Sequence, residues 1–294
     1  MSDEKTIIAD SFNATIFSPS SRPAACLVQY SGANLGRRYV LESADMIAGR
    51  ADEATIQIKD ASVSRQHARF HVRGTDVEVE DLKTTNGTFV NETRIDRGLA
   101  LKDGDMVRLG TVLFKFFAHG NIENVFHDKI YRMATIDATT QIFNKKYLME
   151  ALEAEIKVTK NYKRNMTLIM YDLDFFKKVN DVYGHNAGDL VLRDSAHIVR
   201  GVVRKNDIFG RFGGEEFAII LPETDAKTGV DLAERIRRAV EGHGFKLGSK
   251  MHRQTISIGV AQFSSEMKTP QALIESADKK LYHSKNSGRN KVSV

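Results

Sequence analysis

The sequence has few of the residues that cross-link or anchor a chain: its 294 residues include one cysteine, four prolines and no tryptophan. The single cysteine, Cys26, excludes an intramolecular disulfide framework and a cysteine-based zinc site, and it fits a reducing compartment. The longest apolar runs, such as 168–171, fall far short of the roughly 18–20 residues that a membrane span needs. The acidic, polar residues 1–5 argue against a secretory signal, so we expect a cytoplasmic protein with no membrane span.

The composition indicates a folded protein with two domains. Hydrophobic residues make up 41% of the chain and charged residues 28%, which excludes global disorder. At about 100–200 residues per domain, the length suggests two domains. The formal net charge of +5 permits nucleic acid or a phosphorylated ligand, but so mild an excess is also typical of a solvated surface.

The first part of the chain predicts a tail followed by short strands. Residues 1–22 predict a flexible tail, because Pro19 and Pro23 interrupt a serine-rich stretch without apolar periodicity. From 23 to 118, short runs such as 68–72 alternate apolar and polar residues, and turn residues separate the runs. Many such runs with almost no helical period are typical of an all-β sandwich.

Helical spacing begins after residue 118. In the segment 119–136, apolar residues recur at three- and four-residue steps, which predicts a linker or signalling helix. Residues 137–294 mix apolar strand runs with helical patterns and predict an α+β domain. A Thr-Pro pair at 269–270 marks one helix start, because Thr is a good N-cap and Pro is favoured at the first helical position.

Three polar clusters fall in the loops of the predicted sandwich: Gly-Arg at 49–50, Ser-Arg-Gln-His at 64–67 and Thr-Thr-Asn-Gly-Thr at 84–88. Loops at one end of a sandwich can converge on a ligand while the strands stay rigid. The clusters offer guanidinium groups, hydroxyls and a carboxamide, which suit a phosphate beside a peptide backbone. The alternative is an inert scaffold with an ordinary Asn-Gly turn.

The order of these clusters, with Asp-Gly-Asp before a closing strand, strongly resembles the forkhead-associated (FHA) domain over residues 25–118. FHA domains bind phosphothreonine peptides. The resemblance implies that Gly49 and His67 are structural. It implies these ligand contacts: Arg50 and Ser64 to the phosphate, Arg65 and Thr85 assisting, and Asn86 to the peptide backbone.

The tail raises a hypothesis about that ligand. Thr6 and Thr15 lie just before the domain, so either one, once phosphorylated, is a candidate intramolecular ligand. Tethering raises the effective concentration of a ligand without any new contact. The alternative is a plain disordered leader.

Two acidic clusters stand out in the α+β part. Asp172 and Asp174 follow an apolar strand run, and a Glu pair follows two glycines at 213–216 in a predicted hairpin. If both belong to one sheet, the carboxylates make a hard-oxygen site of the kind that Mg²⁺ prefers together with substrate phosphates. The structural alternatives are Asp174 as the N-cap of the next helix, and the Gly-Gly-Glu-Glu run as a plain turn.

These clusters belong to a series of motifs that resembles the bacterial diguanylate cyclase, or GGDEF, domain over about 137–294. The series includes Asp-x-Asp-Phe-Phe-Lys-x-x-Asn-Asp from 172, Gly-Gly-Glu-Glu-Phe at 213–217 and Ala-Asp-x-x-Leu-Tyr-x-x-Lys-x-x-Gly-Arg-Asn from 277. The resemblance implies a palm-like, ferredoxin-type sheet.

The resemblance also implies a nucleotide site, whose residues match the family's motifs one by one. The implied ligands of Mg²⁺ (or Mn²⁺) are Asp172, Glu215 and the Leu173 carbonyl, with Glu216 or Asp174 assisting. The implied catalytic residues are Glu215, Glu216 and Lys177. The implied GTP-binding residues are Asn180 and Asp189 at the guanine, the backbone of Phe175 and Phe176 at the phosphates, and Lys285 and Arg289 at the triphosphate.

The implied reaction joins two GTP into cyclic di-GMP and releases two pyrophosphates. Each 3′-hydroxyl attacks the α-phosphate of the other GTP, and the metal polarises that phosphate. No dedicated general base is visible in the sequence, and Glu216 is only a candidate. Because each domain holds one GTP, two copies must face each other, so we expect a homodimer. Retention of Asp189 argues against a relaxed cyclase that makes mixed cyclic GMP-AMP.

A third site is implied by an Arg-x-x-Asp pattern. Arg204 and Asp207, with Arg235 on a following helix, match the family's inhibitory product site for cyclic di-GMP, although exposed Arg and Asp residues are usually just a solvated face. The family's entry turn is altered here, since Thr139 replaces a Leu and Lys145 an Arg. Lys cannot reproduce a bidentate Arg pair.

We therefore predict a diguanylate cyclase regulated by phosphothreonine recognition and by its product. The alternatives are a catalytically silent domain that acts as a cyclic di-GMP receptor, and a phosphopeptide adapter. The intact Asp172, Glu215, Lys177 and Lys285 argue against both. The basic residues form small, separate phosphate sites rather than a continuous stripe, so we expect no nucleic-acid partner.

Overall fold

A computed structural model of the chain describes residues 24–294 except 33, 43 and 268, without the side chains of 122 and 124–128. The predicted tail, including Thr6 and Thr15, lies outside the described residues. The chain divides into two compact units between Tyr131 and Arg132.

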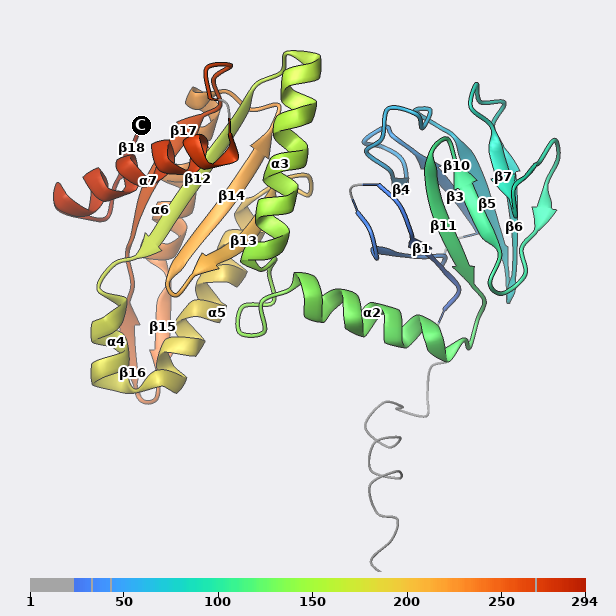
Figure 1. The fold of residues 1–294 in the computed structure, drawn as a ribbon. Helices are drawn as coiled ribbons and strands as arrows, with labels where there is room; N and C mark the ends of the chain where they lie inside the picture. The colour runs from blue at the N-terminus through green and yellow to red at the C-terminus, as the bar shows by residue number, and fades with distance from the viewer. Residues whose placement is uncertain (1–23, 33, 43, 268) are drawn as a thin grey trace, which may run out of the picture. The chain divides into compact units, whose positions relative to one another are not determined.

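The N-terminal unit is a sandwich of two mainly antiparallel sheets (Figure 1). One sheet has the strand order β2-β1-β11-β10-β7-β8 and the other the order β4-β3-β5-β6-β9. The strands are β1 (Cys26–Gln29), β2 (Arg38–Val40), β3 (Asp45–Gly49), β4 (Ile56–Gln57), β5 (Ala68–Arg73), β6 (Asp76–Asp81), β7 (Thr88–Val90), β8 (Thr93–Arg94), β9 (Leu99–Ala100), β10 (Met106–Leu109) and β11 (Val112–Phe117).

Alternation along the strands builds the core of this sandwich. On β5, Ala68 and Phe70 are fully buried and the residue between them is half-buried. On β6, Val77 and Val79 are buried in the same alternating way, and Val79 lies opposite Phe70 in the strand register. The all-β sandwich predicted from this period of two is confirmed.

Helix α2 (Ile122–Thr135) crosses the division between the two units. Its first turns contact the sandwich. The Glu123 carboxylate lies 3.8 Å from the ammonium nitrogen of Lys115 on β11, and a Cβ added to Gly36 would lie 3.0 Å from the ring of Tyr131. A helix therefore occupies the segment in which the apolar spacing predicts one.

The C-terminal unit is a five-stranded sheet with helices on both faces (Figure 1). The strand order is β13-β14-β12-β17-β18. The elements are α3 (Lys145–Tyr162), β12 (Met166–Leu173), α4 (Phe176–Tyr183), α5 (His185–Val202), β13 (Ile208–Gly213), β14 (Glu216–Pro222), α6 (Ala226–Gly242), β15 (Gly244–Leu247), β16 (Lys250–Arg253), β17 (Ile256–Gln262), α7 (Pro270–Asn286) and β18 (Val292–Ser293). Among the residues described, no helix combines the length and the apolar character that a bilayer crossing requires.

The central strand β12 is buried along its whole length and contributes to two cores. Ile169 and Tyr171 pack in the core formed with α5 and α6, whereas Leu168 and Met170 pack in the core formed with α3 and α7. Figure 1 shows these two helix pairs on opposite faces of the sheet. The predicted palm-like α+β fold is confirmed.

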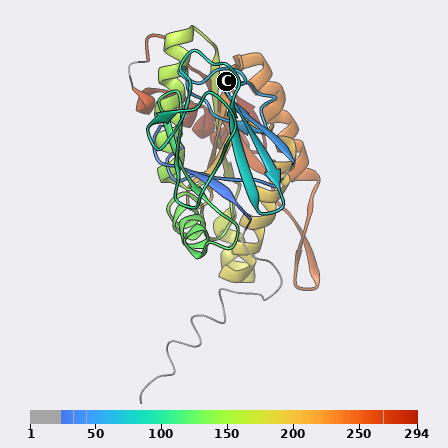
Figure 2. The ribbon, with the colours of Figure 1, turned by 90° about the vertical axis from the view of Figure 1, so that its right-hand side faces the viewer.

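The sequence patterns did not predict α3, α4 or the β15–β16 hairpin. The apolar stripe of α3 is narrow, with buried Leu148, Leu152 and Ile156 four residues apart among polar neighbours. Helix α4 has only eight residues, too few for a helical period to stand out. The β15–β16 hairpin extends from the body of the unit (Figure 2). The side chains of β16 do not alternate between buried and exposed, so that strand lacks the period of two that predicts a strand.

Gly259 on β17 allows α7 to lie close to the sheet. A Cβ there would lie 2.1 Å from the Ala277 carbonyl oxygen and 2.4 Å from the Leu281 amide nitrogen, both in the backbone of α7. We expect Gly259→Ala to lower the free energy of unfolding by about 2–3 kcal/mol, because α7 must shift away from the sheet. Urea unfolding followed by circular dichroism measures this change.

Gly201, near the end of α5, provides the matched control, since no atom lies within 4 Å of a Cβ built there. Gly201→Ala should raise the free energy of unfolding by about 0.5–1 kcal/mol, because Ala loses less backbone entropy in a helix. Equal effects of the two substitutions would contradict the close approach of α7.

Candidate functional site

The central strand β12 delivers Asp172 to the end of the sheet. In the strand registers, Asp172 lies opposite Glu216 of β14 on one side and Ser257 of β17 on the other. Its side chain is only 8% exposed, and its Oδ2 atom lies 2.7 Å from Nζ of Lys285 on α7. The apolar strand β12 thus places a carboxylate at the end of the sheet, where the Lys285 ammonium pairs with it.

The electrostatics of this carboxylate are unusual. The pKa of Asp172 is raised to about 6, chiefly by burial; the Lys285 ammonium lowers it, and the carboxylates of Glu215 and Glu216 raise it. The three predicted carboxylates therefore influence one another at the end of β12. A site in which buried negative charges repel one another is stabilised by an added cation.

The donor set fits a divalent cation that its substrate helps to hold. The Leu173 amide donates to the Glu215 carbonyl oxygen at 3.3 Å, which ties the end of β12 to the Glu pair. Among the described residues, no three His, Cys, Asp or Glu side chains are gathered tightly enough to hold a metal by themselves. Mg²⁺ is commonly held by one or two carboxylates together with substrate phosphates, so Asp172 and Glu215 are the candidate ligands of an ion that would arrive with a nucleotide.

Arg211 holds the turn that carries the Glu pair, a role that the sequence analysis missed. Its Nε and Nη2 atoms donate to the Gly214 carbonyl oxygen at 2.9 and 2.7 Å. Its Nη1 atom donates to both carboxylate oxygens of Asp137, each at 3.2 Å. The strand register shifts between Arg211 and Gly213, so the ladder alone does not fix the turn. The sequence signal that could have predicted this role was the position of Arg211 two residues before the glycine pair.

The carboxylate of Asp137, in the entry turn, accepts hydrogen bonds from Thr140 and Arg211. Burial alone would raise the pKa of Asp137, but hydrogen bonds from Thr140 and the charge of Arg211 outweigh burial and hold that pKa below its usual value. The entry segment and the hairpin that carries Glu215 and Glu216 are therefore joined by a partly buried ion pair.

The entry turn caps α3 and contacts the strand before the hairpin, although Lys145 departs from the family's Arg. Asn144 caps α3 by accepting a hydrogen bond from the Tyr147 amide at 3.0 Å. The Nζ atom of Lys145 lies 4.3 Å from the centre of the Phe212 ring, which is a cation–π contact. Lys145 thus packs on the strand that leads to the hairpin, without a bidentate pair.

Helices α4 and α5 bring the two predicted guanine-reading residues into one region. Asn180 on α4 is half-buried and Asp189 on α5 is exposed. A Cβ at Gly188 would lie 2.0 Å from the Asn180 Oδ1 atom and 3.2 Å from the ring of Phe176. A larger residue at 188 would have to displace the Asn180 carboxamide, so glycine lets α5 approach Asn180 one residue before Asp189.

The predicted phosphate-binding residues gather at the start of α4. Phe175 has a left-handed backbone (φ 57°) and is 53% exposed, whereas Phe176 is buried. The guanidinium carbon of Arg289 lies 4.4 Å from the centre of the Phe175 ring. Lys177 is exposed on the first turn of α4.

The interpretation of Asp174 as an N-cap is wrong. Phe175 occupies the N-cap position of α4, and no side chain caps that helix. Asp174 is 3% exposed, and its carboxylate accepts from the Ser257 hydroxyl at 2.6 Å, the Thr255 hydroxyl at 2.7 Å and the Asn290 amide at 3.1 Å. With both oxygens bonded, Asp174 acts as a tie between the end of β12, the start of β17 and the segment after α7.

The three residues predicted for product binding line one cavity of about 280 Å³. Arg204 and Arg235 are exposed, whereas Asp207 is buried and its Oδ2 atom accepts from the Arg204 amide at 2.7 Å. Asp231 and Thr228 add further polar groups from α6.

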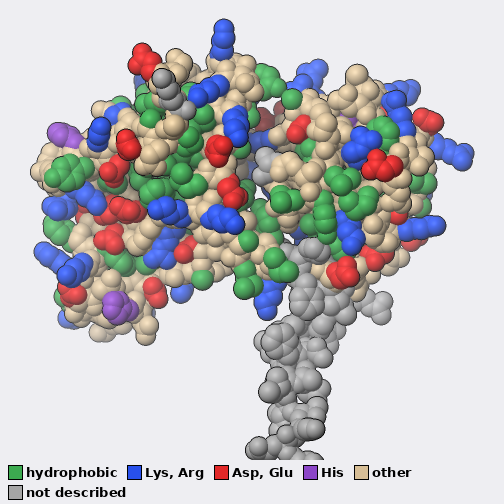
Figure 3. Space-filling model, viewed as in Figure 1, with side chains coloured by type: hydrophobic (Ala, Val, Ile, Leu, Met, Phe, Trp, Pro, Cys, Tyr) green, Lys and Arg blue, Asp and Glu red, His purple; other side chains and the backbone are tan. Residues whose placement is uncertain are grey.

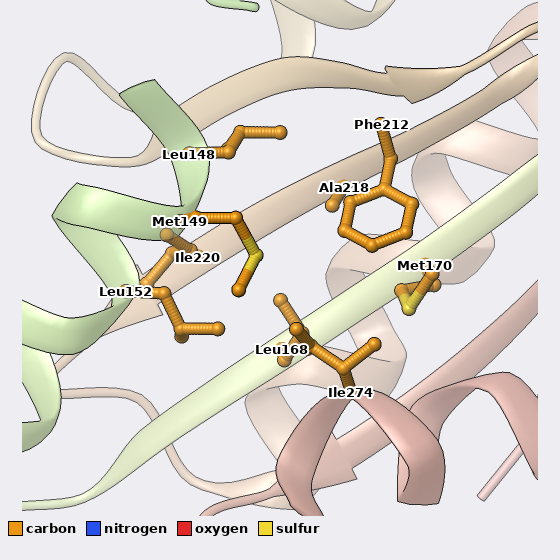
Figure 4. A pocket seen from close by; sticks show the side chains of 9 residues that line it. All are labelled: Leu148, Met149, Leu152, Leu168, Met170, Phe212, Ala218, Ile220 and Ile274. Atoms are coloured by element: carbon orange, nitrogen blue, oxygen red, sulfur yellow. The ribbon is translucent and has the colours of Figure 1, made fainter. Parts of the chain in front are cut away.

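A second, apolar crevice opens between α3, α7 and the sheet (Figure 4). It encloses only about 10 Å³, which is room for no more than a single water molecule. Figure 3 shows hydrophobic side chains gathered over this face of the unit. The crevice is therefore a packing feature and not a nucleotide pocket.

In the N-terminal unit, His67 connects two of the three predicted loops. Its Nδ1 atom accepts from the Ser64 amide at 3.0 Å, so Nε2 carries the proton and donates to the Gly87 carbonyl oxygen at 3.1 Å. Burial lowers the pKa of His67 and outweighs the opposing effects of Gly87 and Asp81. The third loop joins through the Arg50 amide, which donates to the Ser64 carbonyl oxygen at 2.9 Å.

The loop 84–88 is organised by Asp81, which the sequence analysis did not single out. The Asp81 carboxylate accepts from the Thr84 amide and hydroxyl and from the Thr88 hydroxyl, at 2.7 to 3.0 Å. Burial would raise the pKa of Asp81, but these bonds lower it below the usual value. Asn86 donates to the Ser62 carbonyl oxygen at 2.7 Å, while Thr85 and Arg65 are exposed. The sequence signal for this role was the position of Asp81 three residues before Thr84, which is a common turn pattern.

Gly49 is needed where the loops meet. A Cβ at this position would lie 2.1 Å from the Arg65 carbonyl oxygen. The predicted phosphopeptide residues therefore sit on loops that hydrogen bonds and close packing draw to one end of the sandwich.

The fold and the site together define a palm-like domain with a carboxylate site at the end of its central strands, preceded by a sandwich with converging polar loops. A family model described as "Diguanylate cyclase, GGDEF domain" matches residues 134–291, and a model described as "FHA domain" matches residues 46–110. The chain therefore belongs to the GGDEF family and carries an FHA domain.

Curated relatives match the C-terminal unit. Diguanylate cyclase A of Treponema denticola is 39% identical over 172 residues, which are 57% of this chain and 46% of the relative. Response regulator PleD of Caulobacter vibrioides is 40% identical over 167 residues, which are 56% of this chain and 37% of the relative. The match thus spans less than half the length of either relative.

Solved structures match the same unit. The coiled coil and GGDEF domain of DgcB from Caulobacter crescentus, in complex with c-di-GMP, is 31% identical with a TM-score of 0.54, covering 56% of this chain and 88% of that one. The active GGEEF domain of a diguanylate cyclase from Vibrio cholerae is 31% identical with a TM-score of 0.50, covering 52% and 97% of the two chains.

Asp172→Asn tests the electrostatic description of the site. The native pKa of Asp172, about 6, lies above its ordinary value of 3.8. The folded state therefore binds the proton more tightly, so the ionised carboxylate destabilises the fold above pH 6 and has no effect below about pH 4. At pH 7.5 we expect Asp172→Asn to stabilise the unit by roughly 2 kcal/mol and to raise the unfolding midpoint by about 4–8 °C.

Scanning calorimetry without divalent metal measures this midpoint, and the gain should disappear as the pH approaches 4. Asp278→Asn, at an exposed position of α7, is the control and should leave the midpoint unchanged. A lower midpoint for Asp172→Asn at pH 7.5 would mean that the Lys285 ion pair outweighs the effect of burial.

Proposed function

We propose that this protein is a diguanylate cyclase that condenses two GTP into cyclic di-GMP and releases two pyrophosphates. The observation that carries the proposal is the buried Asp172 carboxylate, paired with Lys285 and electrostatically coupled to Glu215 and Glu216. Similarity to a structure described as an active GGEEF domain supports the proposal, because residues 213–217 of this chain have that same signature.

The residues divide the work of binding and orienting the nucleotide. Asp172, Glu215 and the Leu173 carbonyl would hold Mg²⁺ or Mn²⁺, which when bound polarises the α-phosphate and lowers the pKa of the attacking 3′-hydroxyl. Asn180 and Asp189 would hydrogen-bond the guanine edge. The proposed triphosphate contacts are Lys177, Lys285, Arg289 and the amides of Phe175 and Phe176. Glu216 is the proposed acceptor of the 3′-hydroxyl proton.

We further propose that two copies of the chain must pair for each turnover. One domain holds one GTP, and each 3′-hydroxyl attacks the nucleotide of the other copy, so a homodimer brings the two half-sites together. On α2, Ile130 and Met133 are 62% and 74% exposed and lie three residues apart on one side of the helix. An exposed apolar stripe on this helix supports pairing with its counterpart.

Product inhibition is the proposed role of the cavity that Arg204, Asp207 and Arg235 line. Guanidinium groups suit the phosphates and guanine edges of cyclic di-GMP, and the Asp207 carboxylate suits a guanine N–H edge. Two arginines and two carboxylates, those of Asp207 and Asp231, around a cavity of about 280 Å³ support this assignment.

We propose that the FHA domain binds a phosphothreonine peptide through Arg50, Ser64, Arg65, Thr85 and Asn86. The proposed organisation is an FHA domain at 23–118, a linker helix at 119–136 and a cyclase domain at 137–294. Ligand binding would bias how the linker helices of two copies pair. It would regulate the cyclase if the FHA domain binds the phosphopeptide with different affinity in two arrangements of these helices.

Incubation of the purified chain with GTP and Mg²⁺ tests the enzymatic proposal. Mass spectrometry should identify cyclic di-GMP, and two pyrophosphates should be released for each product molecule. Glu215→Ala should lower the rate at least about a hundredfold, because it removes a metal ligand at the reacting phosphate. Added cyclic di-GMP should slow the wild-type reaction.

Glu266→Ala provides the control for that assay, because Glu266 is an exposed residue in the loop before α7. This variant should turn over GTP like wild type. Absence of product from the wild type, with retained binding of cyclic di-GMP, would contradict the cyclase and favour a receptor. Equal rates for wild type and Glu215→Ala would contradict the assigned site.

A phosphothreonine peptide library, compared with the same peptides without phosphate, tests the FHA proposal. The wild-type chain should prefer the phosphorylated set, and Arg50→Ala should weaken that binding about tenfold or more, because a charge-assisted phosphate contact is lost. Fluorescence polarisation measures the affinity.

Arg73→Ala is the matched control, because Arg73 is an exposed residue at the end of β5 opposite to His67. This variant should bind like wild type. If the library shows no preference for phosphate, or if both substitutions weaken binding equally, the assigned site is wrong.

A further inference from the structure

The segment after α7 adopts a backbone that it cannot hold by itself. Arg289 and Asn290 both have left-handed conformations, with φ of 61° and 47°. A residue with a Cβ atom is disfavoured there, and two in succession require support from their surroundings. The Arg289 amide donates to the Ser284 carbonyl oxygen at 3.0 Å, which closes the end of α7 but leaves Asn290 to be fixed by other groups.

The side chain of Asn290 is tied to α6 at both ends. Its Nδ2 atom donates to the Glu241 carboxylate at 2.6 Å, and its Oδ1 atom accepts from Arg237 Nη1 at 2.8 Å. Arg237 is itself held by Glu241 at 2.9 Å and by Glu234 at 3.1 Å. Because both partners are fixed on one helix, Asn290 has a single satisfied orientation.

The backbone of Asn290 is tied to the catalytic strand. Its amide donates to Asp174 Oδ2 at 3.1 Å, and Asp174 also accepts from Ser257 and Thr255 of the neighbouring segment. Asp174 lies two residues after Asp172 and directly before Phe175. The end of β12, the start of β17 and the segment after α7 therefore share one buried carboxylate.

These ties fix the residue between them. Arg289 lies between the end of α7 and Asn290, and its guanidinium carbon is 4.4 Å from the centre of the Phe175 ring. Phe175 follows Asp174 and is left-handed as well, with φ of 57°. The same carboxylate thus sets both the backbone that carries Arg289 and the backbone at the start of α4.

We propose that Asn290 and Asp174 are positioning residues that hold Arg289 for the triphosphate of the bound nucleotide. The inference rests on the proposed function, since it assumes that a nucleoside triphosphate binds at this end of the sheet. Neither residue touches the substrate. They act by fixing the backbone of Arg289. If either tie is lost, the Arg289 side chain is no longer held in one position, and its guanidinium is no longer oriented toward the triphosphate.

Calorimetric titration of the full chain tests this role with two probes, both in the presence of Mg²⁺. One probe is a GTP analogue with a methylene bridge between the α- and β-phosphorus atoms, and the other is GMP, which lacks the β- and γ-phosphates. Asn290→Ala should weaken binding of the analogue about tenfold, equivalent to 1.4 kcal/mol, and leave GMP binding unchanged. Asn286→Ala, an exposed residue at the end of α7, is the matched control and should bind both probes like wild type.

A double-mutant cycle separates positioning from a purely structural role. In an Arg289→Ala background, Asn290→Ala should cause no further loss of analogue affinity, because its effect passes through Arg289. Additive losses, equal losses for both probes or an unchanged analogue affinity would overturn the proposal. Glu241→Ala removes one side-chain tie of Asn290 directly and also removes one of the carboxylates that hold Arg237. This variant should also weaken binding of the analogue, which keeps the proposal testable if Asn290→Ala does not fold, and an unchanged affinity would overturn the proposal.

The wild-type titration distinguishes this proposal from the proposed function. If the wild type binds the analogue and Asn290→Ala binds it equally well, only the positioning role fails. If the wild type binds neither probe, the nucleotide site itself is wrong, and the positioning role falls with it.

Discussion

The candidate site of the C-terminal unit depends on the placement of one buried carboxylate at the end of an apolar strand. Asp172 is destabilising as an ion in that position, since burial is the main cause of its raised pKa of about 6. Lys285 of α7 offsets part of this effect at 2.7 Å, so this ion pair links α7 to the end of β12. A divalent cation delivered with a nucleotide would relieve the repulsion that remains among Asp172, Glu215 and Glu216.

Turns on both sides of this carboxylate are fixed by side chains bonded to backbone. Arg211 holds the Gly214 carbonyl and reaches Asp137 in the entry turn, while Asp174 holds the Asn290 amide. Such turns contain glycine or left-handed residues and have few ladder bonds of their own, so they need external ties. The FHA domain uses the same device, because His67 and Asp81 hold the loops that carry its predicted ligand contacts.

Much of the fold was predictable because it rests on short-range periodicity. The period of two at 68–72 and the apolar run that became β12 predicted the sandwich and the central strand. Helix α3 escaped prediction because its buried stripe is narrow, and α4 because eight residues are too few to show a period. Motif spacing pointed to Asp172 and the Glu pair, yet the same motif suggested an N-cap or metal role for Asp174. Its bonding partners, Thr255, Ser257 and Asn290, lie more than eighty residues along the chain and are invisible to local patterns.

The sequence by itself determined the two-domain plan, the strand and helix types, and the residues whose chemistry suits phosphate and a hard cation. These follow from composition, period and motif, which are local properties of the chain. Only the tertiary structure decided which carboxylate ties segments together through hydrogen bonds and which is paired with Lys285 at the end of β12. Burial, and the identity of the donors that reach each oxygen, arise when β12, β17 and the segment after α7 meet. The raised pKa of Asp172, the bonding of Asp174 and the link from Arg211 to Asp137 are therefore consequences of packing.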